Sequence, residues 1–155
     1  MYLVSIFLLR VSLGWLFLYA GLSKVFDPSW SAAPYLLNAK TFPEFFAFFA
    51  RPDILPFTNF LNEWGLTLIG ISLLLGIFVR LGSVAGLVLM GLYYFPALNG
   101  AFPNPHSFVV DEHVIYALVF LVLAAVRAGR VAGLESWCSR LPICNRFPRL
   151  RVLLG

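Results

Sequence analysis

Long apolar stretches that are almost free of charge constrain this chain more than any other feature. Residues 3–23 contain Arg10 as their only charge, and residues 57–79 contain only Glu63. Residues 81–98 contain no charged side chain. A transmembrane helix needs about 20 mostly apolar residues to cross roughly 30 Å of hydrocarbon. Each of the three stretches therefore predicts one membrane-spanning helix.

A fourth apolar stretch, residues 114–126, is too short to cross a bilayer by itself. Extended back to Phe108 it becomes long enough, and Asp111, Glu112 and His113 then lie on the first turns of the helix. We therefore predict an all-α fold, a four-helix transmembrane bundle. The chain is 61% hydrophobic and only 12% charged, whereas soluble domains carry about 25% charged residues. This composition excludes a soluble enzyme and a disordered chain.

The connection between the first two predicted helices, residues 26–56, is too long to be a plain connector. It is rich in aromatic residues, and prolines interrupt it repeatedly. Thr41, followed three residues later by Glu44, has the pattern of a capping box that starts a helix. We predict an insert of one or two short helices in the extracytoplasmic interface. The insert could anchor the protein through its aromatic side chains or form a lid over an outward-facing pocket.

The distribution of basic residues predicts the orientation in the membrane. Six of the eleven Lys and Arg residues follow Ala125, Arg80 lies in the predicted turn between the second and third helices, and residues 99–110 contain neither type. Basic loops stay in the cytoplasm. We therefore expect a multi-pass protein of the plasma membrane, the inner membrane of a bacterium, with both termini cytoplasmic. Residues 1–137 form the membrane domain, and residues 138–155 form a basic cytoplasmic tail. Charge placed beside a membrane gives no reason to expect nucleic-acid binding.

Ionisable residues at membrane depth are costly, and they mark functional sites or ion pairs. Lys24 lies at the outer end of the first predicted helix, and Glu63 lies about two turns inside the second. Asp111 and His113 begin the fourth helix on the same side. We predict that these four side chains converge in one outer-leaflet pocket, with Glu63 paired to Lys24.

One stripe of the first predicted helix carries both of its cations. Arg10, Gly14, Phe17, Gly21 and Lys24 follow one another at alternating spacings of four and three, which places them on one helix face. Glycines allow helices to approach closely. We predict that this stripe faces the bundle interior, although a purely structural role for so deep an arginine stays open.

Structural explanations also exist for the other candidates. A Lys24–Glu63 pair could simply hold the bundle together, because a buried ion pair is weak evidence for function. Asp111 and Glu112 could complement the positive N-terminus of their helix. His113 is the strongest candidate for chemistry, because histidine titrates near neutral pH and this one lies at membrane depth on an inward-facing stripe.

Cysteine and histidine spacing gives no sign of a bound metal or haem. The chain has two cysteines, Cys138 and Cys144, and no CxxC motif or ligand set with metal spacing. Both cysteines lie in the predicted cytoplasmic tail, where a stable disulfide is disfavoured. A redox role and a purely structural role both stay open for them.

Several ordered segments resemble the DoxX/DoxD family of membrane proteins, from about residue 5 to residue 137. In the first two predicted helices they are Arg10, Leu13-Gly14, Phe17, Ala20-Gly21-Leu22, Lys24, Glu63, Gly65, Leu73-Leu74-Leu75-Gly76 and Arg80-Leu81. Residues 30–33, 35–36, 111–118, 128–130 and 133–134 are most similar to the DoxD branch.

The resemblance to the DoxD branch implies the membrane subunit of a thiosulfate:quinone oxidoreductase. Such an enzyme oxidises thiosulfate to tetrathionate and reduces quinone, and its second subunit is called DoxA. The implied substrates are thus thiosulfate and quinone, and the implied partner is a separate DoxA-like subunit. Under this hypothesis the catalytic residues are His113, Asp111, Glu63 and Lys24, and the quinone-binding residues are Tyr94, Trp30 and Arg10.

Two other hypotheses stay open. The chain could be a non-enzymatic scaffold that binds another membrane or secreted protein, or a second copy of itself. A small-molecule carrier is less favoured, because no proline breaks a predicted helix in its middle. The oxidoreductase hypothesis has its own requirement. Without a bound electron carrier, the two substrates must react directly or through a partner.

Overall fold

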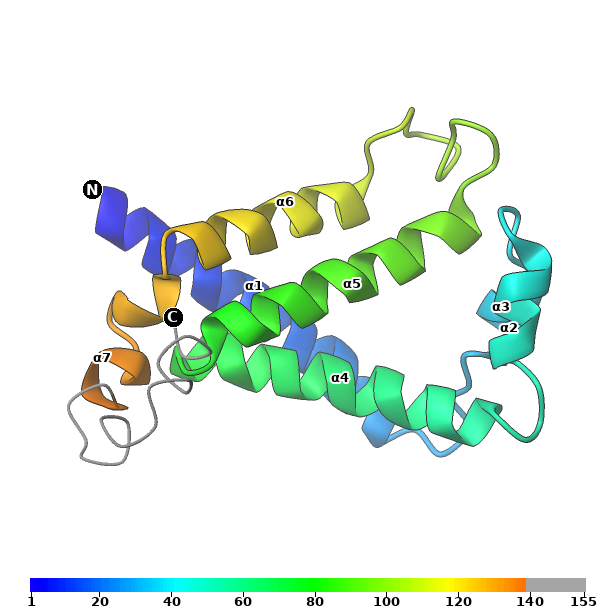
Figure 1. Cartoon of the computed structure of the whole chain (residues 1–155), viewed down its shortest axis with the longest axis horizontal. Coiled ribbons are helices and arrows are strands. Elements are labelled where there is room, and N and C mark those ends of the chain that lie inside the picture. The colour runs from blue at the N-terminus through cyan, green and yellow to red at the C-terminus, as the bar shows by residue number, and fades with distance from the viewer. Residues whose placement is uncertain (139–155) are drawn as a thin grey trace.

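The computed structural model describes residues 1–138, and this part of the chain is helical, with no β-strand (Figure 1). The long helices are α1 (Tyr2–Val25), α4 (Leu55–Leu75), α5 (Val79–Ala97) and α6 (Glu112–Ala125). The short helices are α2 (Ala33–Leu37), α3 (Pro43–Phe49), η1 (Ala128–Arg130) and α7 (Leu134–Cys138). The predicted tail, including Cys144, lies outside the described residues apart from Cys138.

The long helices pack as two pairs that share one core. α1 packs mainly on α4, and α5 packs mainly on α6. Phe17 of α1 and Phe120 of α6 join the two pairs, since both are buried and their rings meet edge to face at 5.1 Å. Leu73 and Leu123 are also fully buried in this core. In Figure 1, α2 and α3 lie at one end of the long helices and α7 lies at the other.

Glycines set the close approach of α1 to α4. A Cβ atom added at Gly21 would lie 2.5 Å from the backbone nitrogen of Thr67, and one at Gly70 would lie 2.4 Å from that of Leu18. Neither helix could carry even an alanine there without moving apart. Arg10, Gly14, Phe17 and Gly21 are all buried, so the prediction that this stripe faces inward is confirmed; Lys24, at its end, is half-buried.

Two predicted helix boundaries are wrong for local backbone reasons. α4 ends at Leu75 instead of continuing to residue 79, because Gly76 adopts a left-handed conformation with φ 65°. Arg80 therefore lies in the first turn of α5 instead of in the connecting turn. α6 begins at Glu112 instead of at Phe108, because Asp111 caps it and Val109 has a positive φ of 59°.

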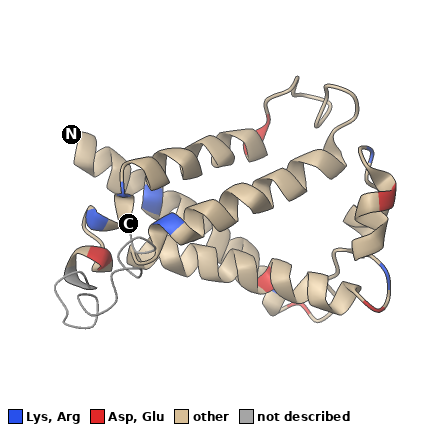
Figure 2. Ribbon diagram, in the orientation of Figure 1, with Lys and Arg blue, Asp and Glu red and all other residues tan. Residues whose placement is uncertain are grey.

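Among residues 1–138, two helices, α1 and α5, are long and apolar enough to cross a membrane by length and composition. α6 is apolar but shorter, and α4 carries Asn59, Asn62 and Glu63 in its first half. Membrane crossing by the four long helices stays a prediction. Figure 2 shows the arginines of α1, η1 and the start of α5 at the end of the molecule where α7 lies. This is the end that the sequence predicts to be cytoplasmic.

The insert between α1 and α4 has a small core of its own, formed by Ala32, Leu36, Ala39 and Phe46. Hydrogen bonds fix it to the end of α5, two of them from the segment between α2 and α3. The Lys40 N–H donates to the Pro96 carbonyl at 2.8 Å, and the Thr41 hydroxyl donates to the Leu98 carbonyl at 2.6 Å. The predicted capping box is therefore wrong, because the Thr41 side chain bonds to Leu98 instead of to the start of α3.

Candidate functional site

A cavity of about 410 Å³ lies where the insert meets the ends of α1, α4, α5 and α6. We call it the polar cavity, because Lys24, Asp111, Glu112 and His113 line it. Its other lining residues are Trp30, Ser31, Ala32, Tyr35, Asn62, Tyr93, Ala97, Pro103 and Asn104. The insert thus forms one wall of the cavity, which favours the lid over the plain anchor.

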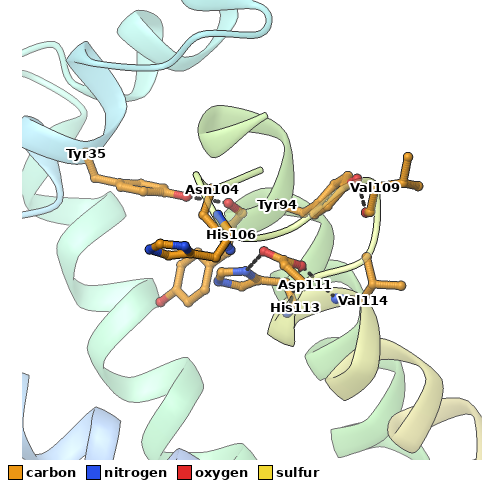
Figure 3. Close-up of polar contacts among 9 residues, drawn as sticks. Tyr35, Tyr94, Asn104, His106, Val109, Asp111, His113 and Val114 are labelled. Carbon is orange, nitrogen blue, oxygen red and sulfur yellow. Dashed lines mark hydrogen bonds and ion pairs between the residues drawn. The ribbon is translucent and has the colours of Figure 1, made fainter. Parts of the chain in front are cut away.

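Asp111 and His113 form a pair at the start of α6 (Figure 3). One carboxylate oxygen of Asp111 accepts hydrogen bonds from the backbone N–H of His113 at 3.0 Å and of Val114 at 3.2 Å. The other lies 2.7 Å from Nδ1 of His113. Asp111 therefore caps the helix and orients the imidazole at the same time. Because a carboxylate only accepts hydrogen bonds, Nδ1 carries the proton, and Nε2 is the nitrogen left for exchange with a bound molecule.

The burial of this pair suits proton transfer. The Asp111 side chain is 3% exposed and that of His113 is 22% exposed. The imidazole is also held by the Tyr93 ring, which meets it edge to face at 5.9 Å. A histidine fixed in this way presents one nitrogen in one direction, as a positioned acid or base requires.

Lys24 reaches the polar cavity, but not through the predicted ion pair. Its Nζ donates to the Ala20 carbonyl at 2.9 Å and lies 5.5 Å from the centre of the Trp30 ring, a cation–π contact. Within residues 1–138, Lys24 and Glu63 form no ion pair, so the predicted pairing is wrong. Glu63 is near enough to act on Lys24 electrostatically, yet it does not line the cavity.

Tyr35 and Tyr93 line the polar cavity, whereas the predicted Tyr94 does not. The Tyr35 hydroxyl donates to the Tyr93 carbonyl, and the two rings meet edge to face at 6.2 Å. Burial, with the negative charge of Asp111, raises the pKa of Tyr35 to about 12, so its hydroxyl stays protonated near neutral pH. Tyr94 does not line the cavity. Its hydroxyl donates to the Val109 carbonyl at 2.6 Å and holds the loop before α6 (Figure 3).

Asn62 is a cavity residue that the sequence analysis missed. It precedes Glu63 on α4, and its Oδ1 is buried without a hydrogen-bond partner among the described residues. Asn59, one turn earlier, accepts a hydrogen bond from the Ala32 N–H at 3.0 Å and ties the insert to α4. Two amides three residues apart in an apolar stretch were the available signal.

Arg10 lies at the opposite end of α1 and does not line the polar cavity. Fourteen residues of helix, about 21 Å, separate it from Lys24. It is fully buried, and its Nη2 donates to the Ala132 carbonyl at 3.2 Å. A Cβ atom added at Gly76 would lie 1.7 Å from its Nη1, so this glycine makes room for the guanidinium. The structure therefore does not bring Arg10 together with the other predicted site residues, and its quinone-binding role stays a prediction.

The polar cavity combines a fixed imidazole, a buried carboxylate, an amine and phenol groups. This set can bind a molecule with carbonyl oxygens, exchange a proton with it and attract an anion. Within residues 1–138, no group of three or more His, Cys, Asp or Glu side chains is placed to hold a metal ion.

Comparison with known proteins gave one finding. A model of the DoxX family matches residues 5–97, more than half of the chain. No curated protein and no solved structure matches the chain.

Proposed function

We propose, from the premise that this chain belongs to the DoxX family, that it is the membrane subunit of an oxidoreductase that reduces quinone. In this proposal the four long helices cross the plasma membrane as a bundle. The insert lies in the extracytoplasmic interface, and both termini are cytoplasmic. The resemblance of residues 111–118 to the DoxD branch supports thiosulfate as the electron donor.

The Asp111–His113 pair in the polar cavity is the observation that carries this proposal. Two thiosulfate ions join through a new S–S bond to form tetrathionate and release two electrons. Quinone takes up these two electrons and two protons to become quinol. His113 Nε2 delivers one proton at a time to a quinone oxygen, and Asp111 stabilises the imidazolium that forms between deliveries. Lys24, together with His113 in its protonated form, attracts the thiosulfate dianion against the negative charges of Asp111 and Glu112 in the same cavity.

The electrons pass directly between substrates held in the cavity or through a separate DoxA-like subunit. In either case the chain supplies the quinone site and its protons. A scaffold that only binds another protein would not need an oriented, proton-exchanging histidine inside a cavity.

Quinol formation by the purified protein in nanodiscs, with thiosulfate as donor, tests the proposal. The variant is His113→Gln, and the matched control is His106→Gln, since His106 is exposed on the loop before α6. We expect turnover to fall about 10²–10⁴-fold in His113→Gln, because a positioned acid or base contributes that much. The control should match the wild type, and both should unfold at the wild-type temperature.

Equal turnover in the two histidine variants would remove the proposed role of His113. The scaffold would be favoured instead if thiosulfate did not change quinol formation by the wild type and another membrane protein copurified stably with it.

A further inference from the structure

A second cavity, of about 400 Å³, lies beside the polar cavity under the insert. We call it the apolar cavity. Its wall comes from α2, α3, α4 and α5, and it includes Leu36, Phe46, Phe49, Leu61, Leu89 and Leu92. No charged side chain of the described part of the chain lines it.

The two cavities meet at four shared residues, Ala32, Tyr35, Asn62 and Tyr93. The polar groups at this junction are the hydroxyls of Tyr35 and Tyr93 and the side-chain amide of Asn62, which interacts with the Tyr93 hydroxyl. The Oδ1 of Asn62 is buried and has no hydrogen-bond partner in the described part of the chain. A buried acceptor without a partner is costly. The hydroxyl group of a bound quinol would satisfy it, whereas a quinone oxygen, which only accepts, would bond to the Nδ2 amide group of Asn62.

The apolar cavity is open on the side of the bundle. Phe57, Leu61 and Leu92 line it and are 62%, 53% and 43% exposed. In a membrane these faces of α4 and α5 contact lipid. A molecule dissolved in the bilayer can thus enter sideways, without passing through water and without movement of the insert.

We propose that the two cavities form one amphipathic site, in which the apolar cavity holds the hydrocarbon chain of a membrane-dissolved substrate. The polar head of the substrate then lies at Tyr35 and Asn62, facing His113. That the polar head of the substrate is a quinone ring rests on the function proposed above. The hydrocarbon chain of a quinone is isoprenoid. Lipid is as apolar as the cavity, so the chain gains little by transfer. The cavity instead selects by shape and fixes the position of the head.

Equilibrium binding of radiolabelled quinones to the protein in nanodiscs tests this site without turnover. One quinone carries a ten-carbon chain, and the other has a methyl group in its place on the same ring. The variant is Leu61→Trp, which fills the apolar cavity. The matched control is Leu68→Trp on the same helix, because Leu68 is 59% exposed and lies outside this cavity.

We expect Leu61→Trp to weaken binding of the long-chain quinone about tenfold, the effect of overfilling a packed site. Binding of the methyl quinone should not change, and Leu68→Trp should change neither. If Leu61→Trp does not fold, Leu92→Trp replaces it with the same expectation.

Two results would overturn the proposal. In the first, Leu61→Trp affects the two quinones equally or not at all. In the second, a ten-carbon alcohol displaces the long-chain quinone at equal concentration, which would assign the apolar cavity to lipid chains in general. Failure of this proposal can be told apart from failure of the proposed function. Leu61→Trp tests binding of the hydrocarbon chain, whereas His113→Gln tests turnover, so either prediction can fail while the other holds.

Discussion

Gly21 decides how closely two helices can pack. Its missing side chain lets the backbone of α4 lie against α1 at Thr67. Gly91 on α5 provides a contrast, because a Cβ atom added there meets nothing within 4 Å. The same residue type therefore has a packing role at one position and none at the other.

Alanine at these two glycines should have opposite effects. Gly21→Ala should lower the free energy of unfolding by about 1–3 kcal/mol, because an overpacked helix contact forces the backbones apart. Gly91→Ala should leave stability unchanged or raise it by about 0.5–1 kcal/mol, since glycine costs a helix that much. Thermal unfolding in detergent measures both. Equal stability of the two variants would contradict the close packing of α1 on α4.

Asp111 has two roles that substitution can separate. Asp111→Asn keeps a side-chain oxygen for the cap, so stability should stay within about 0.5 kcal/mol of wild type. It removes the negative charge that supports a protonated His113, so quinone turnover should fall about 10²-fold or more. Asp111→Ala should lose the same turnover and also about 1 kcal/mol of stability. Unfolding and turnover measurements on both variants check this, and an active Asp111→Asn would refute it.

At the scale of elements, α7 closes the end of the bundle opposite the polar cavity. The Glu135 N–H donates to the Gly76 carbonyl at 3.0 Å, and its side chain is only 2% exposed. Burial raises the pKa of Glu135 to about 7, although the positive charges of Arg130, Arg10 and Arg127 oppose the shift. Burial in the folded chain thus favours the protonated, uncharged form of the Glu135 carboxyl.

This raised pKa predicts a pH dependence of stability. An unfolded glutamate titrates near 4.5, so the folded chain binds more protons between that value and about 7. The contribution is complete below about pH 4.5 and is lost as the pH rises through 7, a change on the order of 3 kcal/mol. Unfolding of wild type, Glu135→Gln and the exposed control Glu44→Gln at pH 5 and pH 8 measures it. Glu135→Gln should remove the change in unfolding free energy between pH 5 and pH 8, and Glu44→Gln should keep it. A change that persists in Glu135→Gln would contradict its assignment to Glu135.

The sequence predicted the helices better than their ends. Apolar stretches were enough to find α1, α4, α5 and α6. The length expected for membrane crossing was a poorer guide, since α6 has only 14 residues and a span needs about 20. The boundaries depended on single backbone conformations, such as the left-handed Gly76 and the cap at Asp111, which hydrophobicity does not encode. The candidate site was predicted only in part. Depth identified Lys24, Asp111 and His113, but Tyr35 and Asn62 come together only when α2 folds onto α4.

At the scale of the whole molecule, the basic end and the polar cavity lie on opposite sides of the bundle. If the basic end is cytoplasmic, the polar cavity opens toward the outside. This arrangement would let an anion such as thiosulfate arrive without crossing the membrane, while a quinone arrives through the bilayer. Orientation is therefore the global property on which the proposed function depends.

Labelling with an impermeant thiol reagent checks the orientation. In a background with Cys138→Ser and Cys144→Ser, intact cells should label Ser107→Cys, which lies on the loop before α6. Ala132→Cys, which is exposed beside α7, should react only after the cells are opened. External labelling of Ala132→Cys would invert the topology and place the polar cavity on the cytoplasmic side.

The contact between Arg10 and Ala132 also has a consequence for biogenesis. These residues are 122 positions apart, so the ribosome makes the first long before the second. Until residues 132–135 emerge, Arg10 lacks the carbonyl and the carboxyl side chain that surround it in the finished fold. The packing around Arg10 of α1 is thus completed only after residues 132–135 have been made.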